Sequence, residues 1–382
     1  MYKLKDFAQD VSVAVKNAQN SPYNKFVGLE HYDSGEPVIT RYTDTSLLSS
    51  SVKEFHTNDI LIARRNVYLK RAGIAFFDGL TSGDSIVLRI YEDCEERTGV
   101  PQKDAIKMLP FILNSNAFWA YANKHADGMN SKRISKEMLY DYEFSLPPLS
   151  EQKILAEKLW AAYRLKESYK KLLAATEEMV KSQFIEMFGD PNSNNKGWKE
   201  SFVKDEFNLG MGKTPARNNP EYWECGTHKW ISISDISSYA RYTEDTSEYI
   251  TDIAIRDSGI KAVPKGTIIM SFKLSIGKTA ITSEDIYTNE AIMAFGGFDE
   301  RIFNIDFLHF LIANKNWLLW ARQAVKGQTL NKELIGNAKI IIPPMKLQEK
   351  FARIYNQADK SKFELSKSID AIDAVIKSLI NS

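Results

Sequence analysis

The stretch LPPLSEQKILAEKL (residues 146–159) returns near the end of the chain as IPPMKLQEKFARIY (residues 342–355). Superposing Pro148 on Pro344 gives an offset of 196 residues, 344 − 148, and the match extends in both directions. A glutamine four positions after the second proline is among the repeated residues. Because a Pro-Pro pair cannot continue a helix backwards, each stretch predicts the start of a helix.

Both predicted helices carry the seam of a coiled coil, an apolar stripe whose residues are spaced alternately three and four apart. In the first copy the seam residues are Leu155, Leu159, Ala162, Lys166, Tyr169, Leu173, Thr176 and Val180. In the second copy they are Phe351, Tyr355, Ala358, Lys362, Leu365, Ile369, Ile372 and Ile376. Each seam contains a lysine at an equivalent place, and a charged seam residue usually fixes register or partner. We therefore expect the two helices to pack on each other.

Composition indicates a folded protein of two ordinary-sized domains. The chain has 382 residues, of which 43% are hydrophobic and 12% aromatic. Its net charge of +1 gives no global basic field, so a nucleic-acid surface would have to be local. The cysteines, Cys94 and Cys225, lack metal-binding spacing and suggest a reducing compartment without structural zinc. With no signal peptide and no apolar run of membrane-spanning length, we expect a soluble cytosolic protein.

The chain divides at turn-forming residues around Gly189 and Pro191. We assign residues 1–146 to a first globular domain, 147–189 to a first spacer helix, 190–341 to a second globular domain, and 342–382 to a second spacer helix. The second domain repeats the first with poor identity: HTNDILIA before Arg64 resembles VPKGTIIMS before Phe272. The predicted fold class is therefore α+β, with two mixed α/β domains related by internal duplication.

Several elements can be placed within the domains. The patterns predict strands at residues 25–32, 59–64 and 85–91, an acidic loop at 92–96, and equivalent helices at 109–125 and 307–323. A polar loop at residues 127–133 has its counterpart at 325–329.

No catalytic motif is complete. Gly-Lys-Thr tripeptides at residues 212–214 and 277–279 mimic the end of a P-loop, but Phe207 and Phe272 stand where its first glycine is required. The histidines are scattered without metal spacing, and neither a nucleophile elbow nor the Asn/Asp-Pro-Pro-aromatic tetrapeptide of amino-methyltransferases occurs. An enzyme that uses other residues stays an alternative.

This chain resembles the specificity subunit of a Type I restriction-modification system. The resemblance lies in the repeated PP-x-x-x-Q helices, the duplicated halves, and the domain boundary that runs from FGDP (residues 188–191) to GW (residues 197–198). The resemblance covers essentially the whole chain. FVGLEHYDSG in the first half, and GKTPARNNPEYW followed by HKWISISDI in the second, resemble the target recognition domains of that family.

The resemblance implies two target recognition domains held apart by an antiparallel coiled coil, each reading one half of a bipartite double-stranded DNA site. It implies a non-catalytic prokaryotic subunit whose helices dock two methyltransferase subunits that methylate adenine. Restriction subunits that hydrolyse ATP and translocate DNA would join the complex. S-adenosylmethionine, ATP and Mg would then be bound by the partners, and this chain would bind no cofactor or metal.

Residues that read DNA must place cationic or amide groups in a groove or against phosphates. In the first domain we predict Arg64, Arg65, Asn66, Lys70, Arg71, Asn130, Lys132 and Arg133. In the second we predict Lys213, Thr214, Arg217, Ser232, Ser234, Lys273, Lys278, Lys326 and Gln328.

A competing hypothesis is a coiled-coil assembly protein whose globular domains bind other proteins. The divergent cationic loops beside equivalent helix starts argue against it. Salt dependence separates the two hypotheses, because phosphate contacts release counterions when DNA binds.

Overall fold

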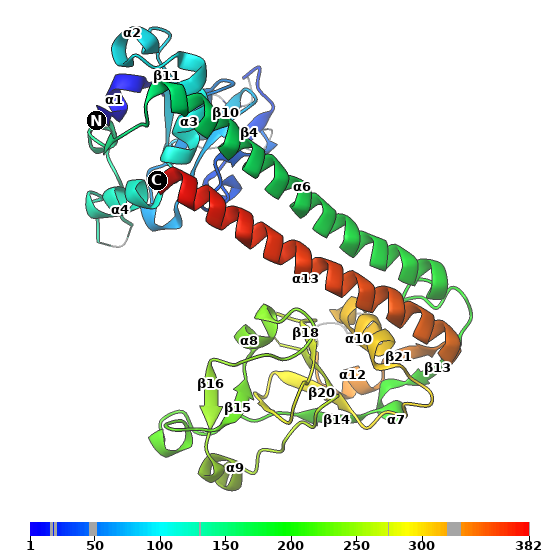
Figure 1. Cartoon of the computed structure of the whole chain (residues 1–382). Coiled ribbons are helices and arrows are strands. Elements are labelled where there is room, and N and C mark those ends of the chain that lie inside the picture. Colours follow the sequence, from blue (N-terminus) through cyan, green and yellow to red (C-terminus); the bar gives the residue numbers. More distant parts are fainter. Residues whose placement is uncertain are drawn as a thin grey trace. The chain divides into compact units, whose positions relative to one another are not determined.

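The computed structural model describes residues 1–15, 18, 21–45, 52–129, 131–273, 275–318 and 330–381. The chain forms two compact units (Figure 1). Each unit has its own hydrophobic core. Unit 1 comprises Met1–Lys171 with Leu365–Ser382, and unit 2 comprises Leu172–Glu364.

Unit 1 is built on two sheets. One has the strand order β2 (Ala8–Asp10), β11 (Ser85–Ile90), β8 (Ile60–Ala63), β9 (Ala72–Ala75) and β5 (Val38–Ile39). The other has the order β3 (Val13–Val15), β7 (Val52–Phe55), β10 (Gly79–Ser82), β4 (Lys25–Val27) and β6 (Thr43–Asp44). Every residue of β8 and β9 is buried, as expected for apolar central strands covered on both faces.

Short helices and one further strand pair complete unit 1. The helices are α1 (Leu4–Phe7), η2 (Leu29–His31), η3 (Val67–Leu69), α2 (Cys94–Thr98), α3 (Gln102–Ile112), α4 (Asn116–Lys124) and α5 (Lys136–Tyr140). Strands β1 (Tyr2–Lys3) and β12 (Glu143–Phe144) pair antiparallel.

Three predicted elements of unit 1 are wrong in extent or type. The strand predicted at 25–32 ends at Val27, where the Gly28 amide donates to His31 Nδ1 (2.8 Å) and closes the turn η2. Part of the acidic loop predicted at 92–96 is the start of α2. The helix predicted at 109–125 is two helices, because the Ser115 hydroxyl accepts the Phe118 amide (3.1 Å) and caps a new start.

Unit 2 also has two main sheets. One has the strand order β14 (Asn208–Met211), β20 (Ile292–Gly296), β17 (Ile268–Ser271) and β18 (Thr279–Ile281). The other has the order β16 (Glu248–Ile250), β15 (His228–Ile231) and β19 (Tyr287–Thr288). Strands β13 (Lys199–Phe202) and β21 (Lys339–Ile342) pair antiparallel. The helices are α7 (Val203–Glu206), η4 (Pro220–Tyr222), α8 (Ile233–Ser238), α9 (Asp252–Ser258), α10 (Ile305–Asn314) and α12 (Lys332–Gly336). The helix predicted at 307–323 corresponds to α10, which ends at Asn314, and residues 319–329 lie outside the described part.

Strand pairing confirms the predicted duplication. The antiparallel succession β2, β11, β8, β9 in unit 1 corresponds to β14, β20, β17, β18 in unit 2. The parallel pair β4 and β10 corresponds to β15 and β19, and β1 with β12 corresponds to β13 with β21. The fold class predicted from the sequence is confirmed, while the exact domain limits stay predictions.

Two long helices begin at the repeated stretches. They are α6 (Leu149–Phe188, 40 residues) and α13 (Met345–Asn381, 37 residues). The repeated glutamine makes the same hydrogen bond in both copies. Gln152 donates to the Pro147 carbonyl (2.9 Å), and Gln348 donates to the Pro343 carbonyl (2.8 Å). Both glutamines are buried, so each pins the Pro-Pro turn at the helix start. None of the described helices is long and apolar enough to span a membrane.

The predicted seam residues are buried or half-buried in both helices, whereas neighbours such as Leu165 and Leu172 are exposed. Within unit 1, Lys166 of α6 lies opposite Asp373 of α13, with 2.6 Å between Nζ and Oδ1. Within unit 2, the Phe184 and Phe351 rings meet at 5.2 Å between centroids. In unit 1, Leu155 near the start of α6 lines a pocket with Leu379 and Ile380 near the end of α13, and in unit 2 the end of α6 lies beside the start of α13 (Figure 1), so the helices run antiparallel in each unit.

The core of unit 2 contains a buried histidine that couples its stability to pH. His309 of α10 is 3% exposed, and its Nδ1 lies 3.1 Å from the Tyr355 hydroxyl. Burial, with the nearby Arg241 charge, lowers the pKa of His309 from 6.5 to about 4. As the pH falls from 6.5 to 4, the His309 imidazole is therefore protonated in the unfolded chain before it is protonated in the folded chain.

We expect the contribution of neutral His309 to the free energy of unfolding to be fully present above pH 6.5. It should fall by about 3 kcal/mol as the pH approaches 4. His309→Gln should remove that part of the pH dependence, measured as the change in Tm of the full chain between pH 7 and pH 4.5. An unchanged profile in His309→Gln would contradict the assignment.

Candidate nucleic-acid interface

Unit 1 joins two of the predicted DNA-binding segments, the connection between β8 and β9 and the loop at residues 127–133. The Asn66 amide donates to the Lys132 carbonyl (2.7 Å), and the Ile134 amide donates to the Arg64 carbonyl (3.0 Å). The Ser131 hydroxyl accepts from Arg65 Nε at 2.8 Å. Segments that are more than 60 residues apart thus form one surface.

We call Arg64, Arg65, Arg133 and Asp84 the arginine cluster. The Asp84 carboxylate lies 3.6 Å from Arg64 Nε, 3.8 Å from an Arg65 nitrogen and 3.5 Å from an Arg133 nitrogen. The arginine side chains are 39%, 46% and 47% exposed, respectively. Three guanidinium groups around one carboxylate leave two positive charges in excess, and guanidinium groups are suited to pair with phosphates or guanine edges.

The neighbouring predicted residues differ in role. The Arg71 guanidinium donates to the carbonyls of Leu29 (3.0 Å) and Arg65 (2.8 Å), and burial lowers its pKa. Arg71 therefore stabilises the connection between β8 and β9 through these hydrogen bonds. Lys70 and Lys132 are exposed. Asn66 and Lys70 have positive φ angles of 55° and 51°, which turn the loop sharply. Asn130 lies outside the described residues.

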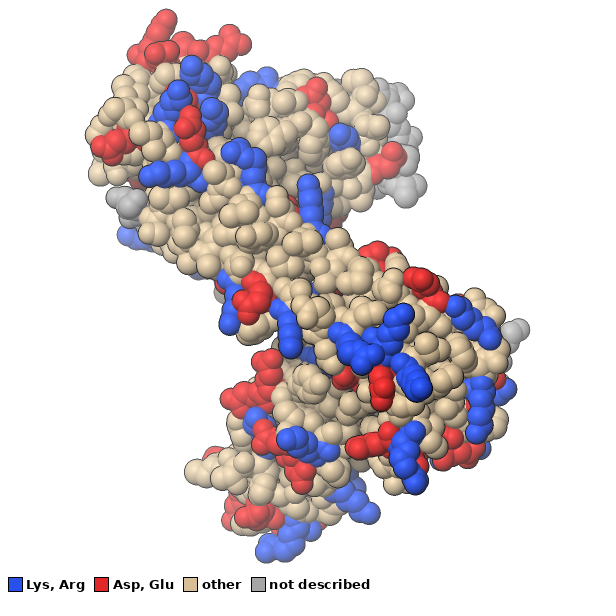
Figure 2. Space-filling model, turned by 45° about the vertical axis from the view of Figure 1, so that its right-hand side comes forward, with Lys and Arg blue, Asp and Glu red and all other residues tan. Residues whose placement is uncertain are grey.

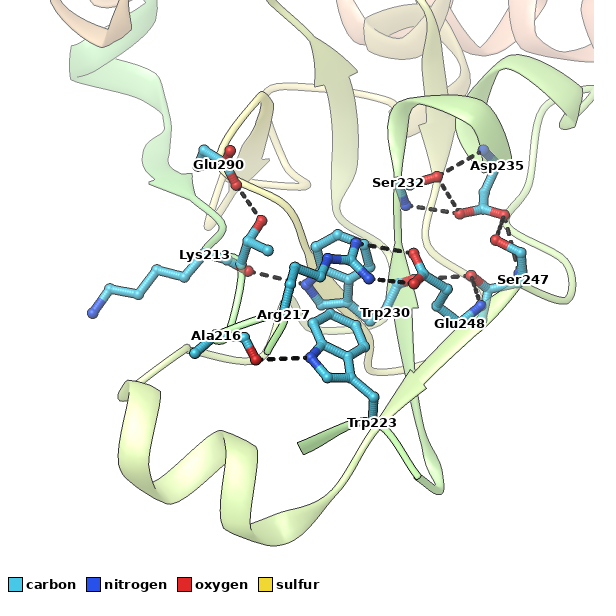
Figure 3. A network of polar contacts seen from close by, with 12 residues as sticks. Lys213, Ala216, Arg217, Trp223, Trp230, Ser232, Asp235, Ser247, Glu248 and Glu290 are labelled. Carbon is cyan, nitrogen blue, oxygen red and sulfur yellow. Dashed lines mark hydrogen bonds and ion pairs between the residues drawn. The ribbon is translucent and has the colours of Figure 1, made fainter. Parts of the chain in front are cut away.

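In unit 2 the predicted Arg217 is held in a cage (Figure 3). Its guanidinium lies 4.0 Å from the Trp223 ring and 4.6 Å from the Trp230 ring, and it pairs with Glu248. The indole nitrogen of Trp230 donates to the Lys213 carbonyl (3.0 Å). The cage fixes the 213–217 loop and pairs this charge with Glu248, while the Arg217 side chain stays 49% exposed.

Two further predicted residues make bonds within unit 2. The Ser232 hydroxyl caps α8 and bonds Asp235 (2.6 Å), as Figure 3 shows. The Thr214 hydroxyl bonds the Glu290 carboxylate. Ser234, in the first turn of α8, is exposed.

Lys273 and Lys278 are exposed in the connection between β17 and β18. This connection is the counterpart of the β8–β9 connection that carries Arg64 and Arg65 in unit 1. The duplicated fold therefore brings cationic residues to the same topological place in both units. Lys326 and Gln328 lie outside the described residues.

The sequence reasoning missed lysines that share a groove with Lys213. This groove of about 820 Å³ is lined, among others, by Lys213, Lys261, Lys265 and Lys332 and by one acid, Glu300. The Lys213 ammonium donates to the Ser258 carbonyl (3.0 Å) at its edge. The Gly- and Pro-containing stretch GIKAVPKG, residues 259–266, was the available signal for a cationic loop.

Elsewhere, charge is mixed. Figure 2 shows Lys and Arg side chains interspersed with Asp and Glu side chains on the face that it draws. Among the described residues, no group of three or more His, Cys, Asp or Glu side chains is placed to hold a metal ion.

Residues 195–372 match the family model of the Type I restriction modification DNA specificity domain. Curated relatives match as well: 168 residues are 26% identical to the MjaIX specificity subunit of Methanocaldococcus jannaschii, covering 43% of this chain and 38% of the relative. A further 194-residue match, 22% identical, is to the HindI specificity subunit of Haemophilus influenzae, covering 49% of this chain and 41% of the relative. The chain is therefore similar to Type I specificity subunits, most directly over residues 195–372. It spans about two fifths of the length of these two subunits.

Solved structures show the fold of a Type I specificity subunit along the whole chain. The S subunit from M. genitalium has a TM-score of 0.56 at 14% identity, covering 99% of this chain and 94% of that chain. A chain from a structural study of complex assembly and conformational transition of the type I R-M system has a TM-score of 0.55 at 15% identity, covering 100% and 98%. At 14% and 15% identity, these matches show a shared fold.

Proposed function

We propose that this chain is the sequence-specific DNA-recognition subunit of a Type I restriction-modification complex. Each globular unit reads one half of a bipartite site. The observation that carries the proposal is the duplicated fold, which brings cationic residues to the same topological place in both units, beside equivalent long helices. Two half-sites need two such readers, whereas a single binding site does not.

The subunit itself is non-catalytic and works in the prokaryotic cytoplasm. Methyltransferase subunits dock on its helices and methylate adenine, and restriction subunits join them. S-adenosylmethionine, ATP and Mg belong to these partners. An apolar stripe supports the docking: Leu165, Leu172 and Met179 of α6 follow at intervals of seven residues and are 45%, 52% and 44% exposed.

The decisive experiment maps methyladenine across the genome of the source cells, with this gene intact, deleted and restored on a plasmid. We expect deletion to remove methylation from one bipartite motif, two short specific blocks around an unread gap, and restoration to return it. An unchanged methylation pattern would contradict the proposal.

A further inference from the structure

The duplicated fold brings two loops to the same place, next to the helix pair in each unit. In unit 1, strand β5 runs parallel to β9, with Val38 opposite Ile74. In unit 2, Tyr242 makes the corresponding parallel bridge to Ile281 of β18. Glu36 lies two residues before Val38, and Arg241 lies one residue before Tyr242, so both lie just ahead of equivalent bridges.

In unit 1, Glu36 holds its loop on α6. Its carboxylate accepts from Lys166 Nζ (2.7 Å) and Lys170 Nζ (2.8 Å), and Lys166 also pairs with Asp373 of α13. The side chains of Glu36 and Lys166 are only 15% and 8% exposed. Burial alone would raise the pKa of Glu36, but the hydrogen bonds from both lysines outweigh it and lower that pKa.

In unit 2 the corresponding loop carries the opposite charge. The Arg241 guanidinium donates to Asp359 (2.7 Å) and Asn356 (2.9 Å) of α13, and also pairs with Asp306 of α10. Arg241 is 4% exposed, and its guanidinium lies 4.1 Å from the Tyr355 ring.

The helices differ at the matching positions. With the offset of 196 residues, Asp359 of α13 corresponds to Tyr163 of α6, and Lys362 corresponds to Lys166. At the place where α13 offers a carboxylate to Arg241, α6 therefore offers a phenol next to two lysines. A buried ion pair contributes little net stability, but an unmatched buried charge is costly, so such pairs discriminate between partners.

We propose that Glu36 and Arg241 are positional codes, specificity-determining residues that restrict each recognition unit to its own stretch of the helix pair. The proposal rests on the proposed function, in which each globular unit reads one half of a bipartite site. Placed in the first position, the second unit would direct Arg241 at Lys166 and Lys170. It would then need a new acid on α6.

Both codes also support the candidate DNA-reading loops. The Gly35 amide, next to Glu36, donates to the Lys70 carbonyl at 2.8 Å. The Ile281 amide donates to the Arg241 carbonyl at 2.8 Å, on the strand that follows Lys278. A mismatched code would therefore displace a reading loop as well as its unit.

The test is a charge exchange in the full chain. Glu36, Lys166, Lys170, Glu167 and Asp373 sum to one negative charge. Glu36→Arg or Lys170→Glu alone changes that sum by two charges, and the double variant restores it. We expect each single variant to lower the Tm by several degrees and the double variant to recover most of the loss. The same exchange in the exposed pair Asp93 and Arg97 serves as control and should change little.

The same assay is applied to a chimera that carries residues 198–341 in both positions. We expect the chimera to have a low Tm, and its unit in the first position to lose protection against hydrogen exchange. Both the Tm and the protection should recover when Tyr163→Asp supplies the missing carboxylate. A double variant as unstable as the singles, or a chimera that is stable without Tyr163→Asp, would overturn the proposal. These readouts do not depend on DNA or methylation, so their failure is distinct from failure of the proposed function.

Discussion

Arg241→Met is expected to destabilise unit 2 by about 3–5 kcal/mol, the cost of removing one partner from a buried ion-pair network. Methionine fills much of the same volume, so the loss reports the charge. The substitution leaves Asp306, which is 8% exposed, and Asp359 without their shared cation. Urea unfolding of the full chain measures the loss, and hydrogen exchange locates it in unit 2.

The control for Arg241 is Arg256→Met in the same unit. Arg256 pairs with Asp257 on the surface, where their side chains are 74% and 38% exposed, so we expect a change within about 0.5 kcal/mol. Arg241→Lys should give an intermediate loss, because an ammonium cannot reproduce the fork of a guanidinium. Equal losses in Arg241→Met and the control would show that the network is not needed.

The double variant Arg65→Ala and Arg133→Ala is expected to bind target DNA roughly 100-fold more weakly when assembled with its partner subunits. Both guanidinium groups flank Asp84 and are about half exposed. Removing two phosphate-competent cations should also reduce the slope of log affinity against log salt by about 2. Fluorescence anisotropy with a duplex that contains the methylated motif, repeated at several salt concentrations, gives both quantities.

Two further variants make this result specific to the arginine cluster. Arg97→Ala removes a similarly exposed arginine on α2, paired with Asp93, and should leave affinity unchanged. Asp84→Asn removes the anion among the arginines and should strengthen binding to any duplex several-fold, because the local excess of positive charge grows. Weaker binding in Asp84→Asn, or wild-type binding in the double variant, would place the interface elsewhere.

Local chemistry allowed the helices and the duplication to be predicted from sequence. A Pro-Pro pair, a glutamine four residues later and an apolar period lie within a few turns of one another, and the repeat at Gln348 needed no long-range contact. Element ends were harder. The break before α4 depends on Ser115, whose capping bond competes with continuing a helix through an apolar stretch.

The sequence allowed the residue types of the candidate site to be predicted, but not the contacts between those residues. Arg64, Arg65 and Arg133 were singled out as cations on loops, but the central place of Asp84 was not visible. Arg217 matched the same criterion and proved to be caged by two tryptophans, because stacking partners are set by the fold. Which partners a loop cation meets depends on segments far away in sequence.

The sequence by itself therefore determined the helix starts, the seam residues and the two-fold repetition, since these follow from backbone restrictions and periodicity within single segments. Only the tertiary structure decided which charges meet. Glu36 and Lys166 are 130 residues apart, and Arg241 and Asp359 are 118 apart, yet each pair is in contact, with side chains at most 25% exposed. Burial makes the sign of such a charge matter, because a low-dielectric surrounding does not screen a mismatch.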